Sequence, residues 1–216
     1  MGPVIGELLP LAVGVAISPI PIIGAILMLL GKHARTTSVG FALGWVAGIV
    51  IATVIFVLLG GGASSGSDAA GWIKLGLGIL LLAEGIREWR ARSGAQSTPK
   101  WMSAVDEMKP LTALGLGFAL AAINPKNLIM SAGAGVTIGG AELSGASTSI
   151  AVVVFVLIAA STVLIPVIAY QVAADALRGP LDRLKEWLEA NNKTIMATLI
   201  LVIGVVLIGK GISALG

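Results

Sequence analysis

Two short polar clusters interrupt long apolar stretches of this chain, and both contain proline. The first is Ser18-Pro19-Ile20-Pro21 and the second is Asn124-Pro125-Lys126-Asn127. Proline removes a backbone donor and disfavours the helical turn before it, so each cluster predicts a broken helix. Freed backbone groups at membrane depth must be buried in protein or face a wet cavity, and paired broken helices indicate a transporter's binding site. The predicted substrate-binding residues are Ser18, Pro19, Pro21, Asn124, Pro125, Lys126 and Asn127.

Lys126 has the clearest chemical implication of these residues. It lies near the middle of the apolar stretch 111–139, where a charge costs about 3 kcal/mol on insertion scales and is therefore a functional candidate. An ammonium with two amides and a free helix N-terminus suits an anionic group such as phosphate, sulfate or carboxylate. The alternative is structural, because Lys126 could snorkel to an interface or cap a helix C-terminus.

Few carboxylates are placed to neutralise Lys126 or to carry a coupled proton. Glu84 lies well inside an apolar stretch and Glu7 lies nearer the end of one, so both are candidate coupling or charge partners. Glu84 alternatively pairs with Arg87, one helical turn further along. A second set of polar residues forms a stripe in the fifth apolar stretch, although Ser and Thr in membrane helices often bond their own backbone. The stripe consists of Ser161, Thr162, Tyr170 and Gln171.

The composition places these residues in a membrane protein. The chain has 216 residues, of which 56% are hydrophobic and 12% are charged, whereas soluble domains carry about 25% charged residues. A membrane helix needs roughly 20 apolar residues, so the chain can fill about six spans. The corresponding apolar stretches are 4–31, 39–60, 72–89, 111–139, 149–174 and 194–215.

Lys and Arg concentrate in the first, third and fifth connections between these stretches, whereas the opposite side carries only Lys74 and Lys210 near a membrane end. By the positive-inside rule, the odd connections are cytoplasmic and both termini are extracytoplasmic. The net charge of +3 is thus a topological signal, and no nucleic-acid partner is expected.

The predicted fold is all-α and integral to the membrane, with six transmembrane helices arranged as two inverted three-helix repeats. Residues 1–92 form the first repeat and residues 111–216 the second, and the broken first and fourth spans occupy corresponding positions. Residues 93–110 form a cytoplasmic linker with a short amphipathic segment, in which Trp101, Val105 and Met108 recur at helical spacing. Residues 181–190 show a similar amphipathic pattern.

Gly40, Gly44 and Gly48 follow one another at four-residue spacing in the second stretch. Such spacing gives a helix one smooth face for close packing. Packing within the chain is the main interpretation, and a homodimer through this face is the alternative.

Enzymatic chemistry finds no support in the sequence. The chain has no Cys, and its one histidine, His33, lies in a connection away from any candidate nucleophile. The Asp residues fall at the ends of stretches or in connections, and no Gly-Lys-Ser/Thr phosphate loop is present. We therefore expect no enzyme activity, no cofactor and no metal.

Several stretches resemble the GAP family, which is named for addressing peptidoglycolipids in mycobacteria and their relatives. The resemblance begins with residues 18–30 and continues in Gly40-Phe41-Ala42-Leu43-Gly44-Trp45. It is also carried by Trp101-Met102, by Gly115-Leu116-Gly117-Phe118 leading to Asn124-Pro125-Lys126-Asn127-Leu128, and by Trp187-Leu188 with Asn191-Asn192. It covers nearly the whole chain and extends to the wider lysine-exporter (LysE) superfamily, whose six-span exporters carry a proline motif in the first span and an Asn-Pro motif in the fourth.

This resemblance implies export of an anionic cell-envelope lipid or glycolipid across the inner (plasma) membrane of an actinobacterium. The expected partners are membrane lipids, the lipid substrate and an envelope lipid exporter. Two alternatives stay open: an exporter of small solutes such as amino acids, and a non-transporting accessory factor for envelope lipid export.

Overall fold

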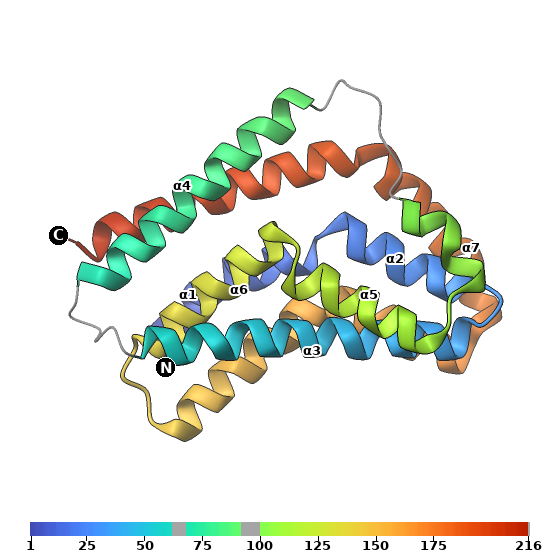
Figure 1. Ribbon diagram of the computed structural model, residues 1–216, viewed down its shortest axis with the longest axis horizontal. Coiled ribbons are helices and arrows are strands. Elements are labelled where there is room, and N and C mark those ends of the chain that lie inside the picture. The colour runs from blue at the N-terminus through green and yellow to red at the C-terminus, as the bar shows by residue number, and fades with distance from the viewer. Residues whose placement is uncertain (62–67, 92–99, 216) are drawn as a thin grey trace.

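The computed structural model describes residues 1–61, 68–91 and 100–215, and all of its regular structure in these ranges is helical (Figure 1). This confirms the predicted all-α class. In chain order the elements are α1 (Gly2–Ala16), α2 (Pro19–Leu30), α3 (Ala34–Gly60), α4 (Asp68–Ala91), the 3-10 helix η1 (Lys100–Glu107), α5 (Pro110–Ala122), α6 (Pro125–Gly139) and α7 (Gly145–Ser213).

Both predicted helix breaks are present. The axes of α1 and α2 meet at 52°, and those of α5 and α6 meet at 63°. Pro19 and Pro125 each stand at the start of the second helix of a pair, where the missing N–H of proline is not needed. Helices α3 and α7 are each long and apolar enough to cross a membrane. Each bent pair, taken as one unit, is also long and apolar enough. The fold is that of a helical membrane protein with about four to six spans.

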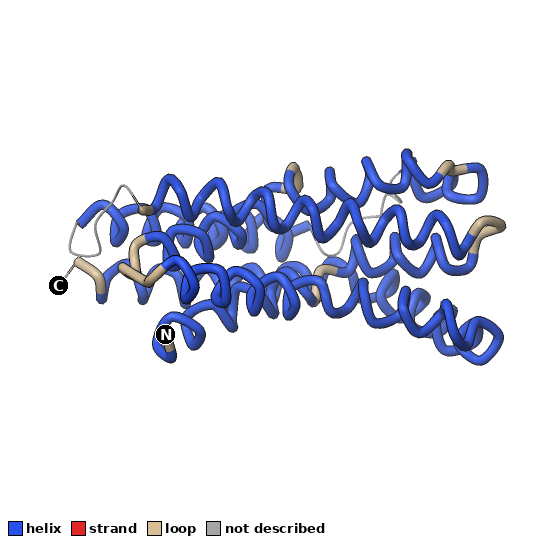
Figure 2. Tube along the Cα trace, turned by 90° about the horizontal axis from the view of Figure 1, so that it is seen from below, coloured by secondary structure: helices blue, strands red, loops and turns tan. Residues whose placement is uncertain are grey.

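Helix α7 is longer than any predicted span. It runs for 69 residues, with a non-helical backbone at Ala173, and reverses its direction across the molecule (Figure 1). The connection expected between the fifth and sixth apolar stretches is thus largely helical. The reversal brings the part of α7 that follows Ala173, its C-terminal arm, back alongside α4. Both termini therefore lie at one end of the bundle (Figures 1 and 2).

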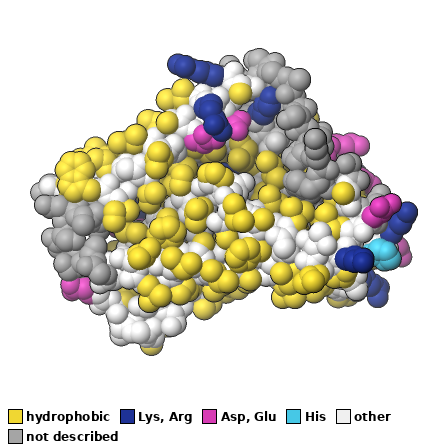
Figure 3. All heavy atoms as spheres, viewed as in Figure 1, with side chains coloured by type: hydrophobic (Ala, Val, Ile, Leu, Met, Phe, Trp, Pro, Cys, Tyr) yellow, Lys and Arg dark blue, Asp and Glu magenta, His cyan; other side chains and the backbone are white. Residues whose placement is uncertain are grey.

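The surface agrees with a membrane setting. Large apolar side chains such as Leu58, Leu111 and Val172 are mostly exposed, as expected when lipid replaces water. Figure 3 shows hydrophobic side chains over the broad face of the bundle, whereas most of the visible charged side chains lie at its right end and along its upper edge.

The three spaced glycines of α3 pack against α5 of the same chain. A Cβ atom at Gly40 or Gly44 would collide with the backbone carbonyl of Pro110 or Leu114, and one at Gly48 would lie 2.6 Å from the Cβ atom of Ala121. The close packing predicted for this face is therefore confirmed. The face is occupied within the chain, so it does not offer the homodimer contact that the sequence left open.

The two amphipathic segments differ in their surroundings. In η1, Val105 is buried and the adjacent Met108 is buried too, and η1 packs beside α2, so these side chains contact protein rather than lipid. The side chain of Trp101 and the linker residues 93–99 lie outside the described residues. In the segment 181–190, Leu181 and Leu188 are buried, whereas Trp187 is exposed.

Candidate functional site

The two helix breaks bring two helix N-termini into one site. Ser18 is the N-cap residue of α2 and has an extended backbone, as has Asn124 at the N-cap of α6. The Asn124 side chain accepts a hydrogen bond from the backbone N–H of Lys126 at 3.1 Å, which satisfies one of the free donors of the first helical turn. Each break thus starts a helix whose positive end lies inside the protein.

A chain of side-chain hydrogen bonds joins the two breaks. Lys126 Nζ donates to Ser18 Oγ at 2.6 Å, and Ser18 Oγ donates to Asn127 Oδ1 at 2.9 Å. Asn127 Nδ2 in turn donates to the backbone carbonyl of Leu120 in α5, also at 2.9 Å. The two sequence clusters therefore form one polar centre, held by side chains more than a hundred positions apart.

This centre is closed to its surroundings. Ser18, Lys126 and Asn127 are 2%, 3% and 1% exposed. The second neighbour of the Lys126 ammonium is the thioether of Met196, at 3.7 Å from Nζ to Sδ. Within the part of the chain that the structure describes, Lys126 forms no ion pair with a carboxylate. A buried ammonium that contacts only neutral groups is costly, and an anionic partner would offset that cost.

Glu7 and Glu84 pair with other cations. Glu7 accepts from Lys74 at 3.1 Å and lies 3.8 Å from Lys210, which links α1, α4 and the end of α7. Glu84 pairs with Arg87 on the outside of α4, which is the alternative that the sequence offered. In this structure neither carboxylate neutralises Lys126.

The three prolines shape the backbone at the two breaks. Pro19 and Pro21 are buried in the first turn of α2, whereas Pro125 is exposed at the start of α6. Their common effect is to begin a helix at the break, because the proline ring presets the helical φ angle.

The four residues of the polar stripe of α7 have separate surroundings. Thr162 donates to the carbonyl of Ala16, the last residue of α1, and so supports the first break. Ser161 bonds the carbonyl of Ile158 in its own helix, as serine in membrane helices often does. Gln171 donates to the backbone of Arg35, and Tyr170 is buried near the other end of α2.

Sequence reasoning missed two members of the centre. Met196 belongs to the sixth apolar stretch, and nothing in its type or spacing marks it as a neighbour of Lys126. The Leu120 carbonyl is a backbone group, so only the position of the second break could have identified it. Both become recognisable once α5, α6 and the C-terminal arm of α7 are placed together.

The arrangement is suited to holding a negative charge. It combines an ammonium, a serine hydroxyl, an amide and two helix N-termini, which are the groups that proteins use for phosphate, sulfate and carboxylate. Among the described residues no group of three or more His, Asp or Glu could hold a metal ion.

Comparison with protein families shows a match over nearly the whole chain. A family model described as Sap, sulfolipid-1-addressing protein, matches residues 8–213. The match includes both helix breaks and the polar centre between them. No match is found among curated proteins or among solved structures.

Proposed function

The chain belongs to the sulfolipid-1-addressing protein family, which is of the LysE and GAP type, and on that basis we propose that it moves an anionic envelope glycolipid across the inner membrane as a secondary transporter or flippase. The family implies a role in the export of envelope glycolipid, namely sulfolipid. The headgroup of a sulfolipid is anionic. It would supply the negative charge that Lys126 lacks in the polar centre.

The observation that carries this proposal is the buried Lys126 ammonium with no carboxylate partner among the described residues. A sulfate ester bound between the breaks would receive hydrogen bonds from Lys126 and from the N-terminal turns of α2 and α6. Charge-assisted hydrogen bonds of this kind are stronger than those to the neutral Ser18 hydroxyl. The acyl chains of the substrate would stay in the surrounding lipid.

The proposed movement is alternating access between two inverted repeats, residues 1–92 and 111–216. The Lys126–Ser18 contact joins the two repeats, and its near-complete burial corresponds to a closed state. Substrate reaches Lys126 only when the helices on one side separate, so the repeats must move relative to each other.

The orientation follows from charge. Both termini lie at one end of the bundle (Figures 1 and 2), and the turn after α2 lies with η1 at the other end (Figure 1). The basic first, third and fifth connections favour the cytoplasm for that second end. We therefore assign both termini to the extracytoplasmic side.

The test is a transbilayer assay with the full chain in phosphatidylcholine vesicles that contain a fluorescent sulfated glycolipid. The chain is expected to move this probe faster than a zwitterionic probe, and Lys126→Ala is expected to abolish the difference. Lys109→Ala is the matched control, because Lys109 is exposed before α5 and its side chain forms no ion pair among the described residues.

Two outcomes would overturn the proposal. One is a folded Lys126→Ala protein that moves the sulfated probe at the wild-type rate. The other is a folded wild-type chain that moves no lipid alone, which favours the accessory role. Faster movement of amino acids than of lipid would favour the small-solute alternative.

A further inference from the structure

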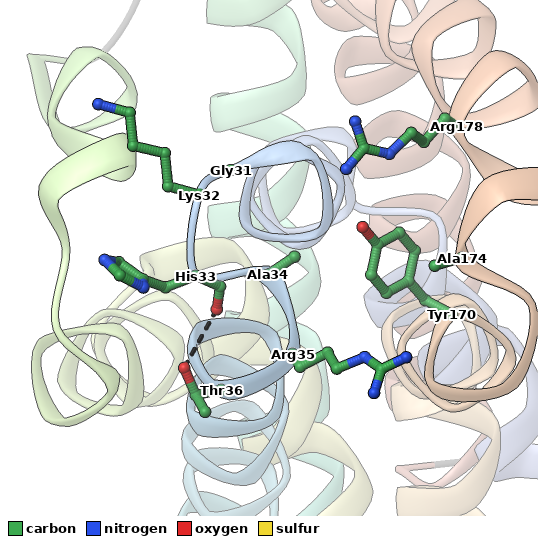
Figure 4. Close-up of a pocket in the computed structure, with 9 residues that line it drawn as sticks. All are labelled: Gly31, Lys32, His33, Ala34, Arg35, Thr36, Tyr170, Ala174 and Arg178. Carbon is green, nitrogen blue, oxygen red and sulfur yellow. Dashed lines mark hydrogen bonds between the residues drawn. The ribbon is translucent and has the colours of Figure 1, made fainter.

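A second polar feature lies at the other end of α2, away from the helix breaks. It is a pocket of about 450 Å³ formed by the turn between α2 and α3 and by α7 beside its non-helical residue Ala173. Its lining includes Lys32, Arg35, Tyr170 and Arg178 (Figure 4). Sequence reasoning treated the basic residues only as topological signals and Tyr170 only as part of a stripe.

The charged side chains that line this pocket are all basic. Lys32, Arg35 and Arg178 line it together with His33, and its described lining contains no carboxylate. None of the three cations forms an ion pair within the described ranges. In Figure 4, Arg178 and Arg35 extend on either side of Tyr170, whereas Lys32 extends from the opposite side of the turn.

Tyr170 adds a second, independent observation at this pocket, namely a hydroxyl that is available to a ligand. The residue is 3% exposed, yet it lines the pocket, and its hydroxyl has no hydrogen-bond partner among the residues that the structure describes. The ring is buried and the hydroxyl opens on the pocket, so whatever occupies the pocket can supply the missing partner. In Figure 4 this hydroxyl points toward the side of Arg178.

We propose that the pocket is an anion-binding site, in which the guanidinium groups of Arg35 and Arg178 and the Tyr170 hydroxyl bind a phosphate or sulfate ester group. Guanidinium groups suit such oxyanions because their N–H donors match two oxygens at once. The anion is either the headgroup of an anionic lipid at that membrane surface or a free oxyanion from solution.

This site is distinct from the polar centre at Lys126. Helix α2 has 12 residues and separates the two by roughly 18 Å, at 1.5 Å per residue. Helix α7 also connects them, because Thr162 contacts the first break and Tyr170 lines the pocket. The inference does not rest on transport, because binding here can be measured with no movement of lipid.

The experiment measures binding to the purified full chain in detergent by isothermal titration calorimetry. The lipid probe is dioctanoyl phosphatidic acid, with zwitterionic dioctanoyl phosphatidylcholine, which has no net charge, as the comparison. The free-anion probe is inorganic phosphate. The variants are Tyr170→Phe and the double change Arg35→Gln with Arg178→Gln. Arg183→Gln is the matched control, because Arg183 is exposed on the same helix and does not line the pocket.

We expect phosphatidic acid to bind more tightly than phosphatidylcholine, and the double variant to lose about tenfold or more in affinity. Tyr170→Phe weakens binding by less, and Arg183→Gln leaves it unchanged. A Lys126→Ala protein keeps this site, so its binding of phosphatidic acid persists. If inorganic phosphate binds with the same dependence on the two arginines, the ligand is a free oxyanion; if only the lipid binds, it is a headgroup.

Three results would overturn the inference. The first is equal binding of the two lipids, and the second is a folded double variant that binds phosphatidic acid as tightly as the wild type. The third is loss of all anion binding in Lys126→Ala alone, which would place the measured site at the helix breaks. The thermal midpoint of each unliganded variant, compared with Arg183→Gln, establishes that the protein is folded.

Discussion

The Nζ atom of Lys126 lies 2.6 Å from the Oγ atom of Ser18, although the two residues are 108 positions apart in the chain. Ser18 is the N-cap residue of α2 and Lys126 lies in the first turn of α6, and each of these helices begins after a break. Their contact therefore fixes the two breaks against each other and places one ammonium between two helix N-termini. A charge at this position is expensive to bury. Variants at Lys126 can therefore distinguish a binding role of this residue from a structural one.

Replacing Lys126 by methionine is expected to leave the protein folded. Methionine is apolar and flexible, and buried charges can often be replaced by apolar side chains without loss of stability. The thermal midpoint in detergent should stay the same or rise. The stabilisation that an added sulfated glycolipid gives the wild type should disappear, because the anion loses its cation.

Unfolding of Lys126→Met would favour the structural interpretation of this lysine. Lys109→Met is the control for the loss of an exposed lysine, and it should keep the lipid-induced rise in thermal midpoint. A Lys126→Met protein that keeps the rise would show that the lipid binds elsewhere.

Ser18→Ala is expected to destabilise the closed state. The change removes the acceptor of Lys126 and the donor to Asn127, and both remaining groups are buried. The free energy of unfolding should fall by about 1 to 2 kcal/mol, measured by denaturant titration in detergent. Ser149→Ala is the control, because Ser149 is exposed and bonds its own helix. Equal effects of the two changes would contradict the assigned role of Ser18.

Gly44→Ala is expected to separate α3 from α5. A methyl group at Gly44 meets the backbone carbonyl of Leu114, which cannot turn aside as a side chain would. Overpacking of this kind costs about 1 to 3 kcal/mol, visible as a lower thermal midpoint. Gly76→Ala is the control, because a Cβ atom there has nothing within 4 Å. A change in oligomeric mass with no loss of stability would instead indicate that the glycine face of α3 forms a dimer contact.

Glu7→Gln is expected to loosen the end of the bundle at which both termini lie. Glu7 holds Lys74 and Lys210, and its removal leaves two neighbouring cations without their shared carboxylate. The side chain of Glu7 is partly exposed, so the loss of stability should be at most about 1 kcal/mol and should shrink at high salt. Thermal midpoints at low and high salt measure it, with the exposed Glu142→Gln as control. A loss that is independent of salt would argue against an ionic cause.

The sequence predicted the breaks because proline removes a backbone donor from a helix, and it singled out Lys126 because a lysine is rare and costly at membrane depth. It could not predict the partners of those residues. By contrast, the local pair of Glu84 and Arg87 was one of its alternatives, because residues three positions apart on a helix are neighbours. Met196 and Tyr170 acquire their roles only from the path of α7, which stays helical through most of the connection expected between the fifth and sixth apolar stretches.

The hydroxyl of Thr162 donates to the carbonyl of Ala16 at the end of α1. That carbonyl is one of the backbone acceptors that a helix end leaves free, and lipid offers it no donor. Thr162→Val keeps the shape of the side chain and removes the donor, so the free energy of unfolding should fall by about 1 kcal/mol. Ser161→Ala is the neighbouring control, because Ser161 bonds only its own helix. Denaturant titrations of the two variants should therefore differ, and equal midpoints would mean that the break at Ala16 is held by other contacts.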